Sequence, residues 1–359
     1  MRILQLIDSL EAGGAERMAV NYANALTTEI EFSGLVATRK EGSLVAQIDP
    51  KVSYLFLNKK KTLDFAALFR FRSFVVANKV THIHAHSTSF FLAFLLKMIC
   101  PFVKLIWHYH YGNNGVLSKK RVVIYRMAIP FFGGVIVVNQ NLKIWCINNL
   151  KAKKVMYLPN FSIKEMNVIN YTSLKGKQGK RIVSLANLRE DKNHFLLLEV
   201  AQKLKHSHPD WTFHLIGKDF EDDYATQIKQ LIIEYNLENI VFLYGSKEDI
   251  GNILDQASIA ILTSQSEGLP VALLEYGLYK KAVVVTDVGE VPTIVDHGKN
   301  GFMVRSNESD LFCQSLIELV DNESLRIDFG KALSNTVQTD YTGEGVMRKY
   351  LEWLEEVVS

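Results

Sequence analysis

The sequence of 359 residues is long enough for two globular domains, and 48% hydrophobic with 22% charged residues is typical of a soluble, folded chain. This composition excludes a disordered chain, a collagen-like fibre and a disulfide scaffold. The three cysteines, Cys100, Cys146 and Cys313, are odd in number and far apart, which favours reduced thiols over disulfides or a zinc cluster.

Charge divides the chain into two parts of opposite sign. Residues 1–165 hold 22 Lys and Arg against 9 Asp and Glu, a balance of +13, and residues 166–359 hold 19 against 29, a balance of −10. We therefore expect two domains with different partners. A basic domain suits nucleic acid, anionic lipid or a phosphorylated substrate. Because no RNA-binding signature or recognition-helix pattern is found, we do not expect nucleic acid as the partner.

Membrane-spanning and signal segments are not expected. No apolar run reaches the roughly 18–20 residues of a membrane span, and the longest, residues 90–99, contains Lys97 and is followed by Pro101. The apolar residues 3–7 run directly into polar sequence, which predicts a strand and not a signal peptide.

Short β-rich runs alternate with helical patterns along the chain. In order, we expect strands at residues 3–7, 34–38, 82–85, 104–107, 135–138 and 154–157, and then at 182–186, 212–216, 240–243, 259–263 and 283–286. This alternation predicts an α/β protein with two doubly wound parallel sheets covered by helices. The polar segment 162–180, which contains several Lys and Gly residues, is the predicted linker.

In each half of the chain, the loop after the first strand is a candidate ligand site, because ligands bind at the carboxyl ends of strands in such folds. Gly13 and Gly14 in the first loop would let the backbone approach a phosphate or sugar, or would simply form a flexible turn. Arg189 and Lys192 in the second could neutralise a diphosphate, or belong to a solvated turn with the acidic residues between them. The absence of Gly-x-Gly-x-x-Gly argues against a dinucleotide enzyme.

Two carboxylates flank the start of another expected helix. Glu267 precedes the turn at 268–270, and Glu275 lies inside the helix that begins near Val271. Amides at a helix start can bind ligand oxygen atoms, and carboxylates beside them can accept hydrogen bonds from sugar hydroxyls. The alternative is an acidic residue that interacts with the helix dipole, together with an ordinary surface glutamate.

The histidines cluster on two expected strands. His82, His84 and His86 alternate along one strand and span about 13 Å, which we take as too wide for one zinc ion. His110, at the carboxyl end of the next strand, is the candidate for a catalytic role, whereas a packed or surface position is the alternative for the others. The acidic loop 219–223 could hold Mg²⁺, but a solvated helix cap is favoured.

Residues 58–72 combine lysine and arginine with phenylalanine, and the basic run 119–121 follows later in the chain. Thr62 is the expected N-cap of a helix here. The pattern suits the surface of an anionic membrane, and the alternative is a core helix with a basic outer face.

Together and in this order, these residues resemble the retaining glycosyltransferases of family 4, the glycosyl transferases group 1, which have the GT-B fold. The key run is Glu267-Gly-Leu-Pro-Val-Ala-Leu-Leu-Glu275, a Glu-x7-Glu motif, and the similarity extends to residues 13–17, 84–86, 158–160 and 189–192. Two departures are local: Asn139-Gln140 stands where many members have a serine, and residues 276–281 replace a stretch of small residues.

The resemblance implies two Rossmann-like domains that face a central cleft. These are an acceptor-side domain at 1–165 and a nucleotide-sugar-binding domain at 166–340, with a closing helix at 341–359 that could pack back on the first. It implies transfer of a sugar from a UDP- or GDP-linked donor to a hydroxyl, with retention of configuration and without metal or cofactor. The acceptor would be a glycan or a polyprenyl-diphosphate-linked saccharide in surface polysaccharide or lipid-linked oligosaccharide assembly. The protein would be cytoplasmic, or bound through its basic domain to the inner face of the plasma membrane.

The resemblance also implies roles for individual residues. Arg189 and Lys192, with amides near Gly14, would stabilise the leaving diphosphate. Glu275 would hold the ribose hydroxyls, Glu267 and the 268–270 backbone the donor sugar, and residues 246–250 the nucleobase, mostly through backbone. The expected catalytic residues are thus His110, Glu267, Arg189 and Lys192, and the expected donor-binding residues are Gly13, Gly14, Arg189, Lys192, Ile250, Glu267, Gly268, Leu269, Pro270 and Glu275.

Two other functions were weighed against sugar transfer. A sugar-nucleotide epimerase on the same architecture needs acid and base groups on both faces of the sugar, whereas the Arg-x2-Lys loop combined with Glu-x7-Glu favours transfer. A non-catalytic partner protein would have lost its donor site. The four charged residues expected at that site are all present: Arg189, Lys192, Glu267 and Glu275.

Overall fold

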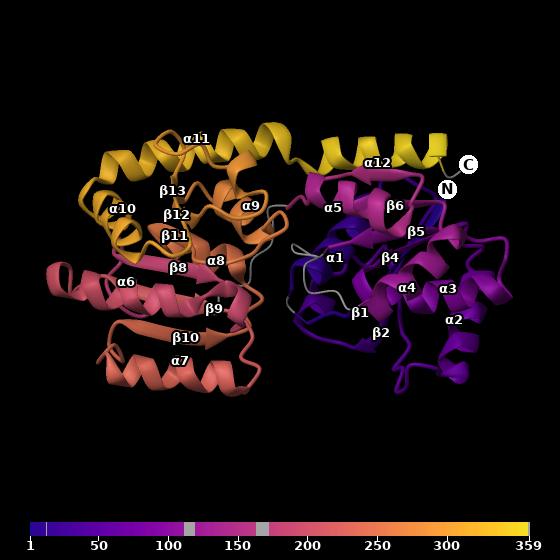
Figure 1. Ribbon diagram of the computed structural model, residues 1–359, viewed down its shortest axis with the longest axis horizontal. Coiled ribbons are helices and arrows are strands. Elements are labelled where there is room, and N and C mark those ends of the chain that lie inside the picture. The colour runs from indigo at the N-terminus through magenta and orange to yellow at the C-terminus, as the bar shows by residue number, and fades with distance from the viewer. Residues whose placement is uncertain (12, 111–118, 163–171, 358–359) are drawn as a thin grey trace. The chain divides into compact units, whose positions relative to one another are not determined.

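The computed structural model describes residues 1–11, 13–110, 119–162 and 172–357, which form two compact units (Figure 1). Unit 1 comprises Met1–Phe161 together with Gly343–Ser359, and unit 2 comprises Ser162–Thr342. The sequence placed the corresponding boundaries after residues 165 and 340. No helix within the described ranges is both long and apolar enough to cross a bilayer.

Unit 1 contains a parallel sheet of seven strands in the order β3-β2-β1-β4-β5-β6-β7. The strands are β1 (Arg2–Ser9), β2 (Phe32–Lys40), β3 (Ser53–Phe56), β4 (His82–His86), β5 (Lys104–Tyr109), β6 (Gly134–Val137) and β7 (Val155–Tyr157). The helices are α1 (Gly14–Leu26), α2 (Phe65–Ala77), α3 (Phe90–Ile99), α4 (Lys119–Ala128), α5 (Gln140–Trp145) and α12 (Gly343–Val357). The strand order reverses next to β1, so the sheet is doubly wound.

Unit 2 repeats this plan with six parallel strands in the order β10-β9-β8-β11-β12-β13. They are β8 (Arg181–Leu185), β9 (Thr212–Ile216), β10 (Val241–Gly245), β11 (Ile259–Leu262), β12 (Ala282–Thr286) and β13 (Phe302–Val304). The helices are α6 (His194–Ser207), α7 (Asp223–Glu234), α8 (Ile250–Gln256), α9 (Val271–Leu278), α10 (Ser309–Asp321) and α11 (Glu323–Asp340). The predicted α/β class with two doubly wound parallel sheets is confirmed.

Helices cover both faces of each sheet, and this explains why strands such as β12 (Ala-Val-Val-Val-Thr) are apolar along most of their length. In β12, Val283 and Val285 pack into a core with residues of α9 and α11, whereas Ala282 and Val284 pack into the opposite core with α6 and α10. Alternate residues thus fill two separate cores. Every predicted strand is present. The sequence missed β3 and β13, which are short strands at the edges of their sheets.

The linker prediction for 162–180 was wrong over its described second half. Leu174 is 2% exposed and belongs to the core of unit 2. The amide and hydroxyl of Thr172 donate to the two carboxylate oxygens of Asp249 at 2.8 and 2.7 Å. The polar composition misled because this segment is held by side-chain hydrogen bonds. Residues 163–171 lie outside the described ranges.

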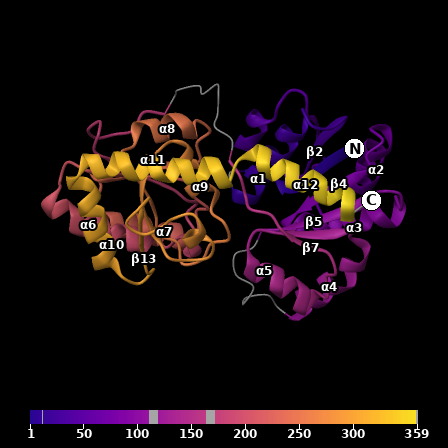
Figure 2. The same cartoon turned by 90° about the horizontal axis from the view of Figure 1, so that it is seen from above.

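Helix α12 belongs to unit 1, where it packs against α1 (Figure 2). Gly134 in β6 leaves room for its Trp353, because a Cβ at Gly134 would lie 2.4 Å from the indole ring. At the start of α2 the predicted cap was wrong: Asp64, not Thr62, caps the helix, and its carboxylate accepts a hydrogen bond from the Ala67 amide at 3.0 Å.

Candidate active site

Two loops of unit 2 meet where the neighbouring strands β8 and β11 end. The backbone amide of Gln265 donates to the carbonyl of Asp191 at 2.8 Å. The hydroxyl of Thr263 donates to the carbonyl of Lys192 at 2.9 Å. These bonds fix the loop that carries the predicted cations against the loop that carries Glu267.

Lys192 and Glu267 form the ion pair at the centre of this contact. The Lys192 Nζ lies 2.7 Å from Glu267 Oε1, which also accepts a 2.7 Å hydrogen bond from the Ser264 hydroxyl. The Glu267 side chain is only 10% exposed and that of Lys192 22% exposed. Removing one partner of an ion pair this shielded from water costs more than breaking a surface pair, because the remaining charge is left poorly hydrated.

The surroundings of Lys192 keep it positively charged. Burial alone would lower the pKa of its ammonium, but the negative charges of Glu267 and Asp191 outweigh burial and raise that pKa above its ordinary value. Asp191 also joins the two cations, since its carboxylate lies 3.0 Å from Arg189 Nε and 3.6 Å from Lys192 Nζ. The Arg189 side chain is 58% exposed and is therefore the more accessible cation.

The backbone after Glu267 is held by a second loop. Gly289 has φ +57°, and a Cβ there would lie 2.0 Å from the Glu267 carbonyl oxygen. The next amide, that of Glu290, donates to the Gly268 carbonyl at 2.9 Å. Leu269, 2% exposed, anchors the turn in the core, and Pro270 is the N-cap of α9. The predicted donor-binding turn is thus a rigid one.

Glu275 is the fifth residue of α9, and its charge acts on the neighbouring Tyr276. Burial raises the pKa of the Tyr276 hydroxyl, and Glu275 and Glu267 both raise it further. That hydroxyl accepts a 2.7 Å hydrogen bond from the Leu185 amide and donates to the Ile261 carbonyl at 3.3 Å. Tyr276, noted above as a departure from the family pattern, therefore ties α9 to β8 and β11.

Ile250 opens α8, and its side chain is 7% exposed within the core of unit 2. Only its backbone can therefore face a ligand. In the acidic loop, the carboxylate of Asp222 caps α7 by accepting from the Ala225 amide at 2.9 Å, and Asp219 is paired with Lys229. The prediction that this loop is a helix cap is confirmed.

Gly13, Gly14 and His110 belong to unit 1. Gly13 is the N-cap of α1 with extended backbone, and a Cβ placed on Gly14 would meet no atom within 4 Å. Gly14 is exposed, whereas a Cβ placed on Gly13 would lie 2.3 Å from the carboxylate of Glu16, so an acidic side chain lies beside the start of the 13-residue helix α1.

His110 follows β5 and lies on a stack of buried histidines. Its ring is 3.8 Å from that of His108 between centroids, and its Nε2 is 2.9 Å from His86 Nδ1. Burial lowers the pKa of His110 to about 3. His110 is therefore neutral near pH 7 and can offer one hydrogen-bond donor and one acceptor.

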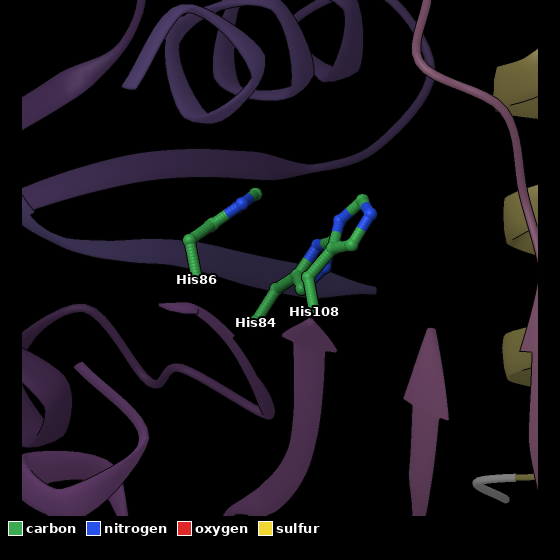
Figure 3. A group of neighbouring side chains, drawn as sticks. All are labelled: His84, His86 and His108. Carbon is green, nitrogen blue, oxygen red and sulfur yellow. The ribbon is translucent and has the colours of Figure 1, made fainter. Parts of the chain in front are cut away.

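The sequence argument against a metal site was that His82, His84 and His86 are too widely spaced along one strand. It does not apply to a different set of three histidines, which the structure brings together from two strands. His84 and His86 of β4 and His108 of β5 offer ring nitrogens that all lie within 4.8 Å of one another (Figure 3). The prediction considered one strand, whereas two neighbouring strands supply this set. Three neutral imidazoles are suitable transition-metal ligands. However, the His84 and His108 rings are parallel, with an interplanar angle of 6°, so their lone pairs do not converge on one point.

The family model described as "Glycosyl transferases group 1" matches residues 170–335, and that described as "Glycosyltransferase Family 4" matches residues 12–161. The chain belongs to glycosyltransferase family 4. The suspected family is therefore confirmed, and the protein is a transferase enzyme. The epimerase alternative finds no support in either match.

Sequence relatives of this glycosyltransferase are distant. The poly(ribitol-phosphate) α-N-acetylglucosaminyltransferase of Staphylococcus aureus is 25% identical over 246 residues, which are 68% of this chain and 48% of the relative, so the match spans about half of that protein. The UDP-Gal:α-D-GlcNAc-diphosphoundecaprenol α-1,3-galactosyltransferase of Escherichia coli is 23% identical over 88% of this chain and 86% of its own.

The fold is shared with solved glycosyltransferase structures. Anabaena Alr3699/HepE, solved in complex with UDP and glucose, superposes with a TM-score of 0.81 at 19% identity, over 99% of each chain. The two units of the family 4 glycosyltransferase therefore have the GT-B fold.

The sequence missed four residues that build the site of this glycosyltransferase. Asp191, Thr263 and Ser264 bind the predicted charged residues directly, and Gly289 makes room for the Glu267 backbone. The contact of Thr263 with Lys192 joins loops 71 residues apart in sequence, and the contacts of Asp191 and Ser264, although local, follow no pattern that the sequence displays. Gly289 was visible in the sequence, but its left-handed backbone was not.

Replacing Gly289 by Ala should distort the Glu267–Gly268 backbone, because the new Cβ would overlap the Glu267 carbonyl oxygen and residues other than glycine are strained at this φ. We expect a loss of about 1–3 kcal/mol in the free energy of unfolding, together with weaker nucleotide binding. Denaturant unfolding and nucleotide titration would measure the two effects. Gly179→Ala, also at positive φ but with no atom near the added Cβ, is the control for backbone strain alone.

The buried histidines should make unit 1 sensitive to acid. Burial lowers the pKa of His84, His86, His108 and His110. Below pH 6.5 these histidines therefore bind protons in the unfolded chain but stay neutral in the folded unit. Stability present above pH 6.5 is therefore lost as the pH falls from about 6.5 towards 3, at about 1.4 kcal/mol per proton and pH unit. Hydrogen exchange of β4 amides between pH 7.5 and 5.5 would measure this loss. A free energy of opening independent of pH in that range would contradict the expectation.

Proposed function

We propose that this glycosyltransferase moves a sugar from a UDP- or GDP-linked donor to a hydroxyl of a glycan or lipid-linked acceptor, with retention of configuration and without a metal ion. The observation that carries the proposal is the shielded Lys192–Glu267 pair, with Arg189 beside it, at the carboxyl ends of β8 and β11. The named activities support the choice of substrates: the E. coli relative is named for UDP-Gal and a diphosphoundecaprenol acceptor, and HepE is solved with UDP.

The leaving group explains why two cations are needed. As the bond between C1 of the sugar and the diphosphate oxygen breaks, negative charge develops on the diphosphate. Lys192, held in its charged form by Glu267 and Asp191, and the more exposed Arg189 stabilise that charge. They perform the task that Mg²⁺ performs in metal-dependent transferases. The acceptor hydroxyl attacks C1 from the same face and gives its proton to the departing phosphate oxygen.

Glu267 orients Lys192 through one carboxylate oxygen and the donor sugar through the other. Its Oε1 already accepts hydrogen bonds from Lys192 and Ser264, so Oε2 is the oxygen that accepts from a sugar hydroxyl. Glu275 binds the ribose hydroxyls, and the backbone at Ile250 borders the nucleobase. In unit 1, the amides near Gly14 bind the diphosphate, and His110 contacts the donor sugar.

A nucleotide screen with an activity assay tests the proposal. UDP, GDP, ADP and their sugars are compared by thermal shift, since a ligand that binds the folded state raises the Tm. Release of nucleotide from the stabilising sugar donor is then measured with a polyprenyl-diphosphate-linked saccharide, in EDTA and in Mg²⁺. We expect acceptor-dependent release in both conditions. Loss of activity in EDTA that Mg²⁺ restores would refute metal independence, and release of an epimerised donor would refute transfer.

Substitutions of Lys192 and Glu275 should affect turnover and nucleotide binding separately. Lys192→Ala removes the positive charge that stabilises the leaving diphosphate, so we expect kcat to fall by about 100-fold or more. Glu275→Ala should instead weaken UDP or GDP binding. Steady-state kinetics and nucleotide titration measure both. Lys203→Ala, which removes a lysine paired with Asp310 on the surface of the same unit, is the control. A wild-type kcat in Lys192→Ala would overturn the leaving-group role.

We further propose that unit 1 binds an anionic membrane through α2. Phe65, Phe69, Arg72 and Val76 share one outer face of this helix by their spacing, and Phe65 and Phe69 are 68% and 58% exposed. Exposed Lys60 and Lys61 precede it. Exposed rings beside cationic side chains suit the boundary of anionic headgroups and acyl chains.

Flotation with vesicles tests the membrane proposal. We expect the protein to float with vesicles that contain phosphatidylglycerol and not with pure phosphatidylcholine. The double variant Phe65→Ser/Phe69→Ser should lose binding to anionic vesicles. Phe220→Ser, which removes an exposed ring of unit 2, should retain it. Equal recovery with both kinds of vesicle would refute the proposal.

A further inference from the structure

Beneath His110, a row of three hydrogen-bonded side chains crosses the sheet of unit 1. Gln5 lies on β1, His86 at the end of β4, and His110 directly after β5. These three strands are neighbours in the sheet order. His86 Nε2 lies 2.8 Å from Gln5 Oε1, and His86 Nδ1 lies 2.9 Å from His110 Nε2. The row therefore connects the interior of the sheet to the residue expected to meet the donor sugar.

The orientation of Gln5 determines where the protons lie in this row. The side-chain oxygen Oε1 of Gln5 lies 2.8 Å from His86 Nε2, whereas Gln5 Nε2 has no hydrogen-bond partner among the described residues and the Tyr350 hydroxyl lies 3.1 Å from His84 Nδ1. The carbonyl oxygen of the Gln5 amide therefore faces His86. Because a carbonyl only accepts, His86 carries its proton on Nε2.

Both histidines of the row are electrically neutral, and this determines which nitrogen of His110 carries the proton. Gln5 and His86 are both fully buried, and burial holds the pKa of His86 well below its ordinary value. A neutral imidazole with its proton on Nε2 has a bare Nδ1, so His110 must donate from its own Nε2. His110 is neutral as well, and its Nδ1 is then an acceptor.

The stack around the row prevents the rings from turning. His86 lies between His84 and His110, with ring centroids 4.4 and 5.2 Å away. Tyr22 packs on the same group, its centroid 6.0 Å from that of His86. Rotation of either imidazole would require this buried group to repack, so the proton positions are set by the fold.

We propose that Gln5 and His86 are positioning residues that hold His110 in the Nε2–H tautomer and so present its Nδ1 as an acceptor for a hydroxyl of the donor sugar. The direction of the bond to the sugar, from substrate to protein, is thereby fixed before the donor binds. This inference rests on the proposed function only where it assigns the partner of Nδ1; the tautomer itself does not depend on it.

A pair of substitutions at one position separates hydrogen bonding from packing. In His86→Asn, the side-chain oxygen can replace Nδ1 and accept from His110, whereas His86→Leu fills the space without an acceptor. We expect His86→Asn to retain most of the wild-type kcat, and His86→Leu to lose about tenfold or more with a smaller change in KM. His82→Asn, on the same strand but bonded to Thr81, is the matched control.

Nitrogen NMR of protein labelled with ¹⁵N-histidine reads the tautomer directly, without substrate. We expect a protonated Nε2 and a bare Nδ1 on His110 in the wild type and in His86→Asn, and a mixture of tautomers in His86→Leu. A wild-type His110 protonated on Nδ1, or a His86→Leu variant with unchanged tautomer and unchanged kcat, would overturn the proposal.

Two further variants keep the test decisive. If His86→Leu does not fold, Gln5→Leu removes the acceptor for His86 Nε2 instead and should likewise give a mixture of tautomers on His110. His110→Ala separates the two claims. If it leaves kcat and KM unchanged while the wild-type spectrum shows the expected tautomer, the role of His110 in donor binding fails and the positioning by Gln5 and His86 stands.

Discussion

The candidate site of unit 2 depends on an ammonium group kept charged where little water reaches it. A cation in such a place is stable only if carboxylates compensate for the lost hydration. Glu267 and Asp191 do so for Lys192, and Ser264 and Thr263 hold the partners in place. Lys192 has two carboxylate partners, so removing Glu267 would leave Asp191 beside it, whereas removing Lys192 would leave the shielded carboxylate of Glu267 without its paired cation. The rigidity of these two loops is thus a consequence of electrostatics as much as of packing.

Much of the architecture could be predicted from the sequence, because parallel strands buried on both faces are continuously apolar and their helices are amphipathic. The edge strands β3 and β13 were missed because their three or four residues carry little pattern. The segment after residue 171 was mistaken for a linker because hydrogen bonds, not apolar residues, hold Thr172. The helix start at Asp64 was displaced by two residues because two neighbouring polar residues can each act as a cap.

The candidate site shows the same division. The motif residues Arg189, Lys192, Glu267 and Glu275 were found because their spacing is local, and the structure joins Lys192 directly to Glu267 and, through Asp191, to Arg189. The contacts that make the arrangement rigid come from pairs distant in sequence, such as Thr263 with Lys192 and Gly289 against the Glu267 backbone. The histidine set required knowledge of which strands are neighbours. Spacing along one strand could not show that His108 lies beside His84.

Helix α12 has a consequence for the biogenesis of the protein. Its Tyr350 hydroxyl lies 3.1 Å from His84 Nδ1, and its Trp353 fills the space beside Gly134, so unit 1 is built from both ends of the described chain. During synthesis, residues up to 161 emerge first and must wait for the whole of unit 2 before this helix can cover their histidines. On the ribosome, the histidines of unit 1 therefore stay exposed to solvent until α12 has been synthesised. Unit 2 is continuous in sequence and can fold before that point.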